Sequence, residues 1–278
     1  MDHFYKTITI SLQNLVIFSI ILPMMKKIFC FLLQLPLYAL YVGNPAEPQL
    51  IDQGFFMSQD SFATIKIGYQ GDAVFDRKLR AQGGARGPID RFKIHMDQGA
   101  VTLNLIDRIE VYGSLGSFNA TLWDRPKADG KRREYETRDH WTAGGGLRIL
   151  LMQWKHTILG CDGKVQYSAP RVKWVTVDGT ASSANYELTY REWQLSLAVS
   201  HTIDIFTPYL AAQYSAVHAD INGIPGAVLP HSHFKMHARE RFGMAVGCSF
   251  SNCKKFDLNI EARLISEQAA TLAANLKF

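Results

Sequence analysis

Nine charged residues stand inside segments whose neighbours alternate between apolar and polar side chains. They are Lys66, Arg91, Lys93, Lys164, Glu192, Lys235, Arg239, Glu261 and Arg263. If these side chains border a water-filled interior, they set the electric field there and select ions, and the basic majority would favour anions. The alternative is an interior filled by ion pairs, with Glu192 or Glu261 facing a neighbouring Arg or Lys.

Two other groups of residues could carry chemistry. His231, His233 and His237 could share part of a strand face, but only Glu240 adds a ligand at a suitable spacing. We therefore expect a solvated loop edge there, with no metal and no cofactor.

A hydrolase working at the outer rim is a second chemical hypothesis. His218, Asp220, Asp139 and His140 are its candidate residues. No Ser–His–Asp triad or pair of carboxylates can be placed among them, so we expect that the protein is not an enzyme.

The cysteines give one structural expectation. Cys248 and Cys253 flank a short turn, and we expect them to form a disulfide if their Cα atoms come within about 7 Å. Two free thiols are the alternative. If Cys248 and Cys253 are bridged, Cys161 remains unpaired, facing lipid or a neighbouring chain.

The elements that position these residues are strands. In the last eleven residues, Ala270, Leu272, Ala274, Leu276 and Phe278 alternate with polar or small residues, so the apolar set falls on one face. The same alternation predicts strands near 62–76, 91–106, 109–123, 140–154, 157–177, 186–200, 206–218, 234–250, 256–265 and 268–278.

The connections between these strands fall into two classes. Those at 107–108, 155–156, 201–205 and 251–255 are short. Those on the other side, at 77–90, 124–139, 178–185 and 219–233, are long and rich in Gly, Pro, Ser and charge, and only 266–267 on that side is tight. Short periplasmic turns and long external loops are typical of outer-membrane barrels. The sequence therefore predicts an all-β fold, an antiparallel transmembrane β-barrel of about ten strands, with twelve as the alternative count.

The start of the chain predicts export. Met25-Lys26-Lys27 precedes an apolar run from Ile28 to Leu33, and Ala39 offers a cleavage site. We expect residues 1–39 to be an over-long start plus a cleaved signal peptide, 40–61 a periplasmic N-terminal segment, and 62–278 the barrel. An uncleaved anchor helix is the alternative.

Composition excludes several classes of protein. Charged residues make up 20 % of the 278 residues and aromatic residues 12 %, which fits neither a disordered polar chain nor a helical membrane bundle. The formal net charge is +5, and its one basic cluster is Lys131-Arg132-Arg133, so we expect no nucleic-acid partner.

Several blocks resemble the major outer membrane protein family of chlamydiae. They are Val42 to Pro48, Gly68 to Arg77, Asp107 to Gly116, Glu192 to Tyr209 and Val246 to Phe278, in the same order as in that family. The chain is similar to a shortened member with fewer cysteines.

The resemblance implies an outer-membrane porin for small hydrophilic solutes, with a possible structural role. It also implies a homotrimer, contact with outer-membrane lipid, and Phe278 as the signal read by the assembly machinery. Because ten strands enclose a narrow lumen, conduction rests on the resemblance. The alternative is a closed barrel that acts as a surface adhesin or structural protein through its external loops.

Overall fold

The structure is a computed structural model that describes residues 41–51, 62–82, 88–126, 130–224, 233–251 and 255–278. The predicted signal peptide lies outside the described residues. No helix in the described ranges is long and apolar enough to cross a membrane.

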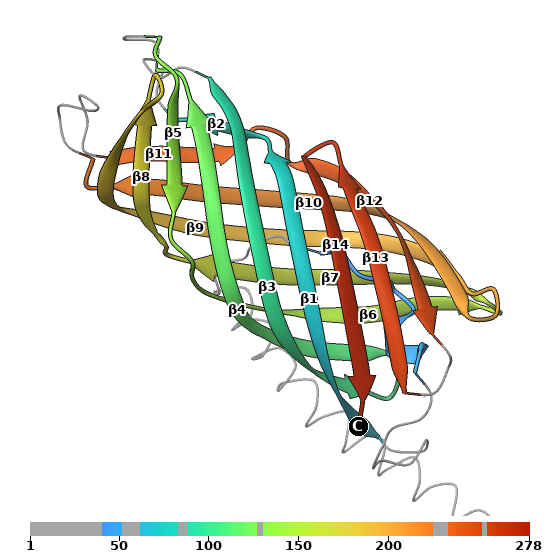
Figure 1. The fold of residues 1–278 in the computed structure, drawn as a ribbon. Helices are drawn as coiled ribbons and strands as arrows, with labels where there is room; N and C mark the ends of the chain where they lie inside the picture. The colour runs from blue at the N-terminus through green and yellow to red at the C-terminus, as the bar shows by residue number, and fades with distance from the viewer. Residues whose placement is uncertain (1–40, 52–61, 83–87, 127–129, 225–232, 252–254) are drawn as a thin grey trace, which may run out of the picture. The chain divides into compact units, whose positions relative to one another are not determined.

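Ten of the strands in the described ranges close into an antiparallel barrel (Figure 1). In ring order after β1 they pair as β3, β4, β6, β7, β9, β10, β12, β13 and β14, and β14 pairs with β1. Their bounds are β1 (Ala63–Arg77), β3 (Ile89–Leu105), β4 (Ile109–Asp124), β6 (His140–Trp154), β7 (Thr157–Ser168), β9 (Thr180–His201), β10 (Phe206–Asn222), β12 (Phe242–Ser251), β13 (Phe256–Leu264) and β14 (Glu267–Lys277). The predicted fold class and the count of ten are confirmed.

Four shorter strands extend the sheet at the end with the long connections. They are β2 (Leu79–Ala81), β5 (Arg133–Thr137), β8 (Arg171–Val177) and β11 (His233–Ala238). β11 and β2 continue outward from β10, while β5 and β8 bridge β4 and β9. The external end is therefore a hydrogen-bonded extension of the wall, where we expected loops.

Two predicted strands are divided in the structure. The expected strand 157–177 breaks between β7 and β8 at Ala169 and Pro170, where proline cannot donate a ladder hydrogen bond. The expected strand 234–250 is β11 and β12, separated by a short turn.

The connection 178–185, expected as a loop, is a tight hairpin between β8 and β9. Asp178 and Gly179 both have positive φ, +46° and +85°. This is the conformation of a type I′ turn, which Asp-Gly favours and whose twist matches that of the flanking strands. The Asp-Gly pair was the available signal, and β9 starts at Thr180 because of it.

The outer surface of the barrel is apolar at the level of the ring strands. Leu195, Leu197 and Val199 on β9 are 42–54 % exposed, while the alternating Gln194 and Ser196 are buried inside. This alternation leaves a hydrocarbon face toward lipid and a polar face toward the interior, as in other membrane barrels.

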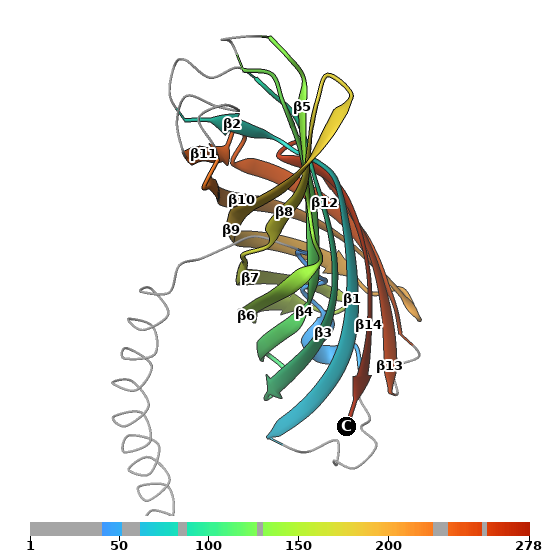
Figure 2. The same ribbon diagram turned by 60° about the vertical axis from the view of Figure 1, so that its left-hand side comes forward.

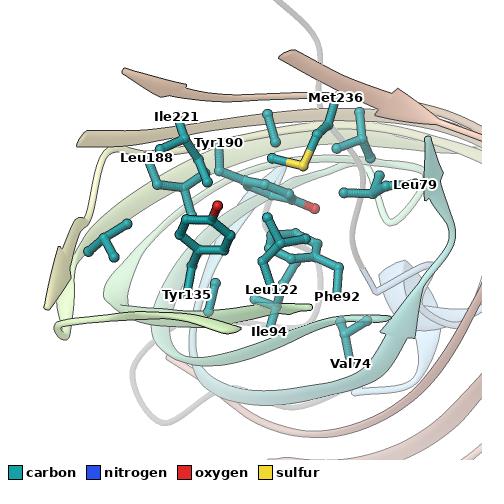
Figure 3. Close-up of a cluster of buried hydrophobic side chains, with 14 of the residues drawn as sticks. Val74, Leu79, Phe92, Ile94, Leu122, Tyr135, Leu188, Tyr190, Ile221 and Met236 are labelled. Carbon is teal, nitrogen blue, oxygen red and sulfur yellow. The ribbon is translucent and has the colours of Figure 1, made fainter. Parts of the chain in front are cut away.

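The interior of the external half is instead packed with apolar side chains, which we call the apolar cluster (Figure 3). Phe92, Phe118, Tyr190, Phe234 and Met236 are among its members, each at most 2 % exposed. Tyr190 packs against both Phe92 and Phe118, with ring centroids 5.9 and 5.2 Å apart. In this half the barrel is built like a water-soluble protein, apolar inside and polar outside.

Tyr135 on β5 shows how dry this region is. Its side chain is 1 % exposed within the apolar cluster. Burial, with a smaller contribution from the negative charge of Asp124, raises the pKa of the Tyr135 phenol above its ordinary value.

Candidate functional site

Residues 41–51, which we call the plug segment, lie inside the periplasmic half of the barrel (blue in Figure 2). The Val42 and Gly43 amides donate to the Glu261 carboxylate at 2.9 and 3.0 Å. Asn44 Nδ2 donates to the Thr207 carbonyl at 3.0 Å and to Ser249 Oγ at 2.8 Å. The segment is thus fixed to inward groups of β10, β12 and β13.

The second half of the plug segment contains a short 3-10 helix, η1 (Glu47–Gln49), and binds the opposite wall. Lys66 Nζ donates to the Glu47 carbonyl at 2.6 Å, and the Glu47 carboxylate pairs with Arg148. Lys277 Nζ donates to the Ile51 carbonyl at 2.7 Å. We expected 40–61 to be a periplasmic segment; its described part is enclosed by the barrel because inward Lys, Glu and Asn side chains satisfy its backbone.

Gly43 is required by the path of the plug segment. Its φ is +79°, and a Cβ there would stand 2.1 Å from Nη2 of Arg148. Another residue would meet both backbone strain and a collision with the side chain that holds Glu47.

A lower network of charges surrounds the plug segment. Lys66 pairs with Glu110 at 2.5 Å, and Arg148 pairs with Glu110 at 2.8 Å and with Asp162 at 3.5 Å. Lys164 pairs with Asp162 at 3.2 Å. Cations and anions alternate across β1, β4, β6 and β7, so the positive charges on this wall are locally neutralised.

An upper network continues toward the apolar cluster. Arg263 pairs with Asp72 at 2.6 Å, Glu267 at 2.7 Å and Glu261 at 3.3 Å. Arg263 therefore connects Glu261, whose carboxylate holds the plug segment, with Asp72 and Glu267.

Arg77 completes this upper network. It pairs with Glu192 at 2.5 Å and with Glu267 at 2.9 Å. Glu192 in turn accepts a hydrogen bond from the hydroxyl of Tyr190, a member of the apolar cluster. The polar contacts thus run without a break from the plug segment to the apolar cluster.

These interior charges are shielded from water. Lys66, Arg77, Glu110 and Arg263 are each at most 2 % exposed. Charged residues on the wall of an open aqueous channel would be substantially exposed. The cavity beside Lys66, Glu110 and Arg148 measures about 40 Å³, which has room for about one water molecule.

A larger cavity of about 180 Å³ lies at the periplasmic mouth. Gln49 and Leu50 of the plug segment form one side, and Lys155, His156 and Asp204 of the short turns form another. It ends at the plug segment, so the lumen is closed in this conformation.

Five of the nine charged residues predicted to face the interior do so: Lys66, Lys164, Glu192, Glu261 and Arg263. All five form ion pairs or hydrogen bonds with other interior residues or with the plug segment. That these five residues line a conducting path stays a prediction.

The other four predicted residues point outward, which corrects the expectation. Arg91 and Lys93 alternate with the buried Phe92 and Ile94. Lys235 is exposed between Phe234 and Met236, and the Arg239 side chain is 67 % exposed. The expectation assumed a polar interior along the whole strand, whereas the external half has an apolar interior and a wet exterior.

Sequence reasoning missed most of the partners of the correct residues. These are Glu47, Asp72, Arg77, Glu110, Arg148, Asp162 and Glu267. Asp72 has the same strand parity as Lys66, and Asp162 the same parity as Lys164, so the register itself was a usable signal. Glu47 gave none, because nothing in its sequence context places the plug segment inside the barrel.

The remaining predictions have mixed outcomes. Cys161 and Cys248 lie on the outward face, and neither forms a disulfide with another described residue. Cys253 is outside the described residues, so a Cys248–Cys253 bridge stays a prediction. The Phe278 amide donates to the Ile65 carbonyl at 2.8 Å, which ties the last residue to β1. Its role as an assembly signal also stays a prediction.

The candidate hydrolase residues are not brought together. His218 and Asp220 lie on β10, while His140 begins β6, and β7 and β9 stand between them in the ring. Within the described part of the chain, no group of three His, Cys, Asp or Glu side chains is arranged to hold a metal ion; His231 lies outside that part.

Comparison with known proteins gives consistent relatives. The family described as Chlamydia major outer membrane protein matches residues 145–232. The major outer membrane porin, serovar D, of Chlamydia trachomatis is 24 % identical over 87 % of this chain and 95 % of its own length. The major outer membrane porin of Chlamydia abortus is 22 % identical over 88 % of this chain and 96 % of its own length.

Solved structures that are similar include the outer membrane protease OmpT from Escherichia coli, at 9 % identity and a TM-score of 0.42, over 78 % of this chain and 96 % of that protein. An outer membrane channel from Pseudomonas putida is similar at 11 % identity and a TM-score of 0.40, over 82 % of this chain and all of that protein.

Proposed function

We propose that this integral protein of the outer membrane, which is similar to the chlamydial major outer membrane porins, is a porin for small hydrophilic solutes that rests closed. Its lumen opens when the plug segment leaves the ring of strands and the side chains of the apolar cluster rearrange. A homotrimeric assembly, as the resemblance implies, is part of this proposal.

The observation that carries the proposal is the way the plug segment is held. Its contacts to the wall are mostly hydrogen bonds and ion pairs from side chains, such as Asn44 with Ser249 and Glu47 with Arg148. Its apolar contacts are small: Val42 touches three alanines, and Ala46 and Leu50 touch Leu150 and Ile158. Strand pairing closes the ring without the plug segment, so the segment can move while the barrel stays intact.

A second function, a permanently closed barrel with a structural or adhesive role, is favoured by the apolar cluster. Phe92, Phe118 and Met236 belong to the wall strands and cannot leave with the plug segment. In this alternative the external loops carry the function, and the interior charges serve only to hold the barrel together.

Planar-bilayer conductance separates the two functions. We expect Asn44→Ala with Glu47→Gln, which removes contacts to β10, β12 and Arg148, to raise the frequency of salt-proportional openings over wild type. Gln49→Ala is the matched control, because the amide of Gln49 bonds only the exposed Gln153 among the described residues. The control should conduct like wild type.

A reversible lock tests whether the plug segment is the gate. In a background with Cys161, Cys248 and Cys253 changed to Ser, Asn44→Cys and Ser249→Cys place two thiols where the native side chains touch at 2.8 Å. Oxidation should silence the channel and reduction restore it. Silence of every variant, including the loosened double variant, would refute the porin and leave the closed barrel.

A further inference from the structure

A row of four basic side chains crosses the outer surface of the barrel on four adjacent strands. Arg80 on β2 pairs with His237 on β11, His237 with His218 on β10, and His218 with Arg191 on β9. Directly paired residues of antiparallel strands point to the same side, and neighbouring strands are about 4.8 Å apart. The side chains therefore form a continuous outward-facing row across β2, β11, β10 and β9, which are hydrogen-bonded neighbours.

Arg241 joins this row from the turn before β12, and the five residues together are the basic patch. The His218 and His237 rings are 5.0 Å apart in an edge-to-face arrangement. In the described part of the chain, Arg80, Arg191 and Arg241 have no carboxylate within ion-pair distance.

Few carboxylates oppose the basic patch. Asp220, two residues beyond His218 on β10, is an acidic side chain near the patch. Lys235 on β11 lies directly opposite Asp220. Glu240 is paired with Arg239 at 3.6 Å. The patch is therefore net positive.

An aromatic layer lies directly below the basic patch on the same strands. Trp193 and Tyr214 have ring centroids 5.2 Å apart, and Tyr214 and Phe242 5.1 Å apart. Arg241 Nη1 donates to the Tyr214 hydroxyl at 3.1 Å, which links the two layers. Trp and Tyr rings in this position mark the boundary between hydrocarbon and headgroups.

The order of side chains is the same on the two strands that flank β10. On β9, exposed Leu197 and Leu195 precede Trp193 and then Arg191 toward the external end. On β12 and the turn before it, Val246 and Met244 precede Phe242 and Arg241. An acyl chain lying on these leucines would place its headgroup beside the arginines.

From this arrangement we propose that the basic patch binds the phosphate of an anionic lipid in the external leaflet. Arg191 and Arg241 donate charge-assisted hydrogen bonds to the phosphate oxygens, and His218 and His237 add donors between them. The acyl chains lie against the aromatic layer and the apolar residues below it. A soluble anion would lack that second contact, so the ligand is a lipid.

The test uses the full-length protein refolded in nanodiscs of phosphatidylcholine. Binding of added bisphosphorylated lipid A is measured by native mass spectrometry, against the same lipid with its phosphates removed. We expect wild type to retain lipid A and to release the dephosphorylated form. Arg191→Gln with Arg241→Gln should weaken lipid A binding about 30-fold, at about fivefold for each basic side chain near a membrane surface.

The matched control is Arg108→Gln with Lys155→Gln, which removes the same charge from exposed positions at the periplasmic turns. It should bind lipid A like wild type. If the double variant does not fold, Arg191→Gln alone serves, because no described residue hydrogen-bonds its guanidinium and removing it leaves no group unpaired.

Three results would overturn the proposal. One is equal retention of phosphorylated and dephosphorylated lipid. Another is equal loss of binding in the periplasmic control. The third is displacement of lipid A by millimolar inorganic phosphate, which would assign the patch to a soluble anion. None of these depends on whether the barrel conducts.

Discussion

At the scale of single residues, the interior depends on cations that each neutralise several carboxylates. Arg263 is the clearest case, with Asp72, Glu261 and Glu267 all within 3.3 Å. A buried ion pair is often no better than an apolar pair of the same size, but removing one partner leaves an uncompensated charge. Arg263 therefore matters mainly because it prevents three buried carboxylates from lacking a cation, and less because its ion pairs add stability.

We predict that Arg263→Met lowers the free energy of unfolding by about 3–5 kcal/mol, because three carboxylates lose their shared cation. Urea unfolding of the barrel in phospholipid vesicles measures it. Arg239→Met, which breaks an exposed pair with Glu240, should cost less than about 1 kcal/mol. Equal effects of the two substitutions would show that the interior charges are solvated.

At the scale of elements, the external hairpins are strands, and tight turns set their register. Asp178 and Gly179 fix the pairing of β8 with β9, from Val177 opposite Thr180 up to Arg171 opposite Glu187. β8 also pairs with β5, so this turn positions the wall around the apolar cluster.

We predict that Gly179→Ala destabilises the hairpin by about 1–2 kcal/mol, since alanine resists the left-handed backbone that Gly179 adopts at φ +85°. Hydrogen exchange of the Val177 and Thr180 amides should accelerate correspondingly. Gly163→Ala is the control: its Cβ would meet Leu195 at an ordinary 3.9 Å, so exchange in the hairpin should not change. Unchanged protection in Gly179→Ala would exclude a constraint at this turn.

At the scale of the whole barrel, the outer surface of the wall faces lipid around the ring strands and water toward the external end. Around the ring strands the outside is apolar and the inside polar, as in Leu197 against Gln194 on β9. Toward the external end the same wall has Arg91 outside and Phe92 inside. The change of polarity along β3 marks where the barrel leaves the membrane.

We predict that Phe118→Ala costs about 3–5 kcal/mol in unfolding free energy, because Phe118 is fully buried in the apolar cluster and its loss leaves a cavity. Leu272→Ala on the lipid face should cost less, since lipid fills the space that the side chain vacates. Urea unfolding in phospholipid vesicles measures the unfolding free energy of both variants. A larger loss for Leu272→Ala would contradict a packed external core.

The sequence predicted the fold well and the interior only in part. Alternation in β14 and the uneven connections were sufficient for ten strands, because strand parity and turn length are local properties. Whether the Lys93 side chain points inward or outward could not be predicted from local sequence, because it depends on how far β3 extends beyond the membrane. The position of Glu47 depends on contacts with Arg148 and Asn275, which only the closed ring brings near.

The seam between β1 and β14 sets an order of events in the making of this molecule. The two strands come from opposite ends of the ring sequence, so the free edge of β1 must be shielded until β14 arrives. The plug segment precedes β1 and can enter the ring after it has closed, so the seam does not have to wait for it. A barrel that closes first has Lys66 and Arg148 without their contacts to Glu47 until the plug segment enters.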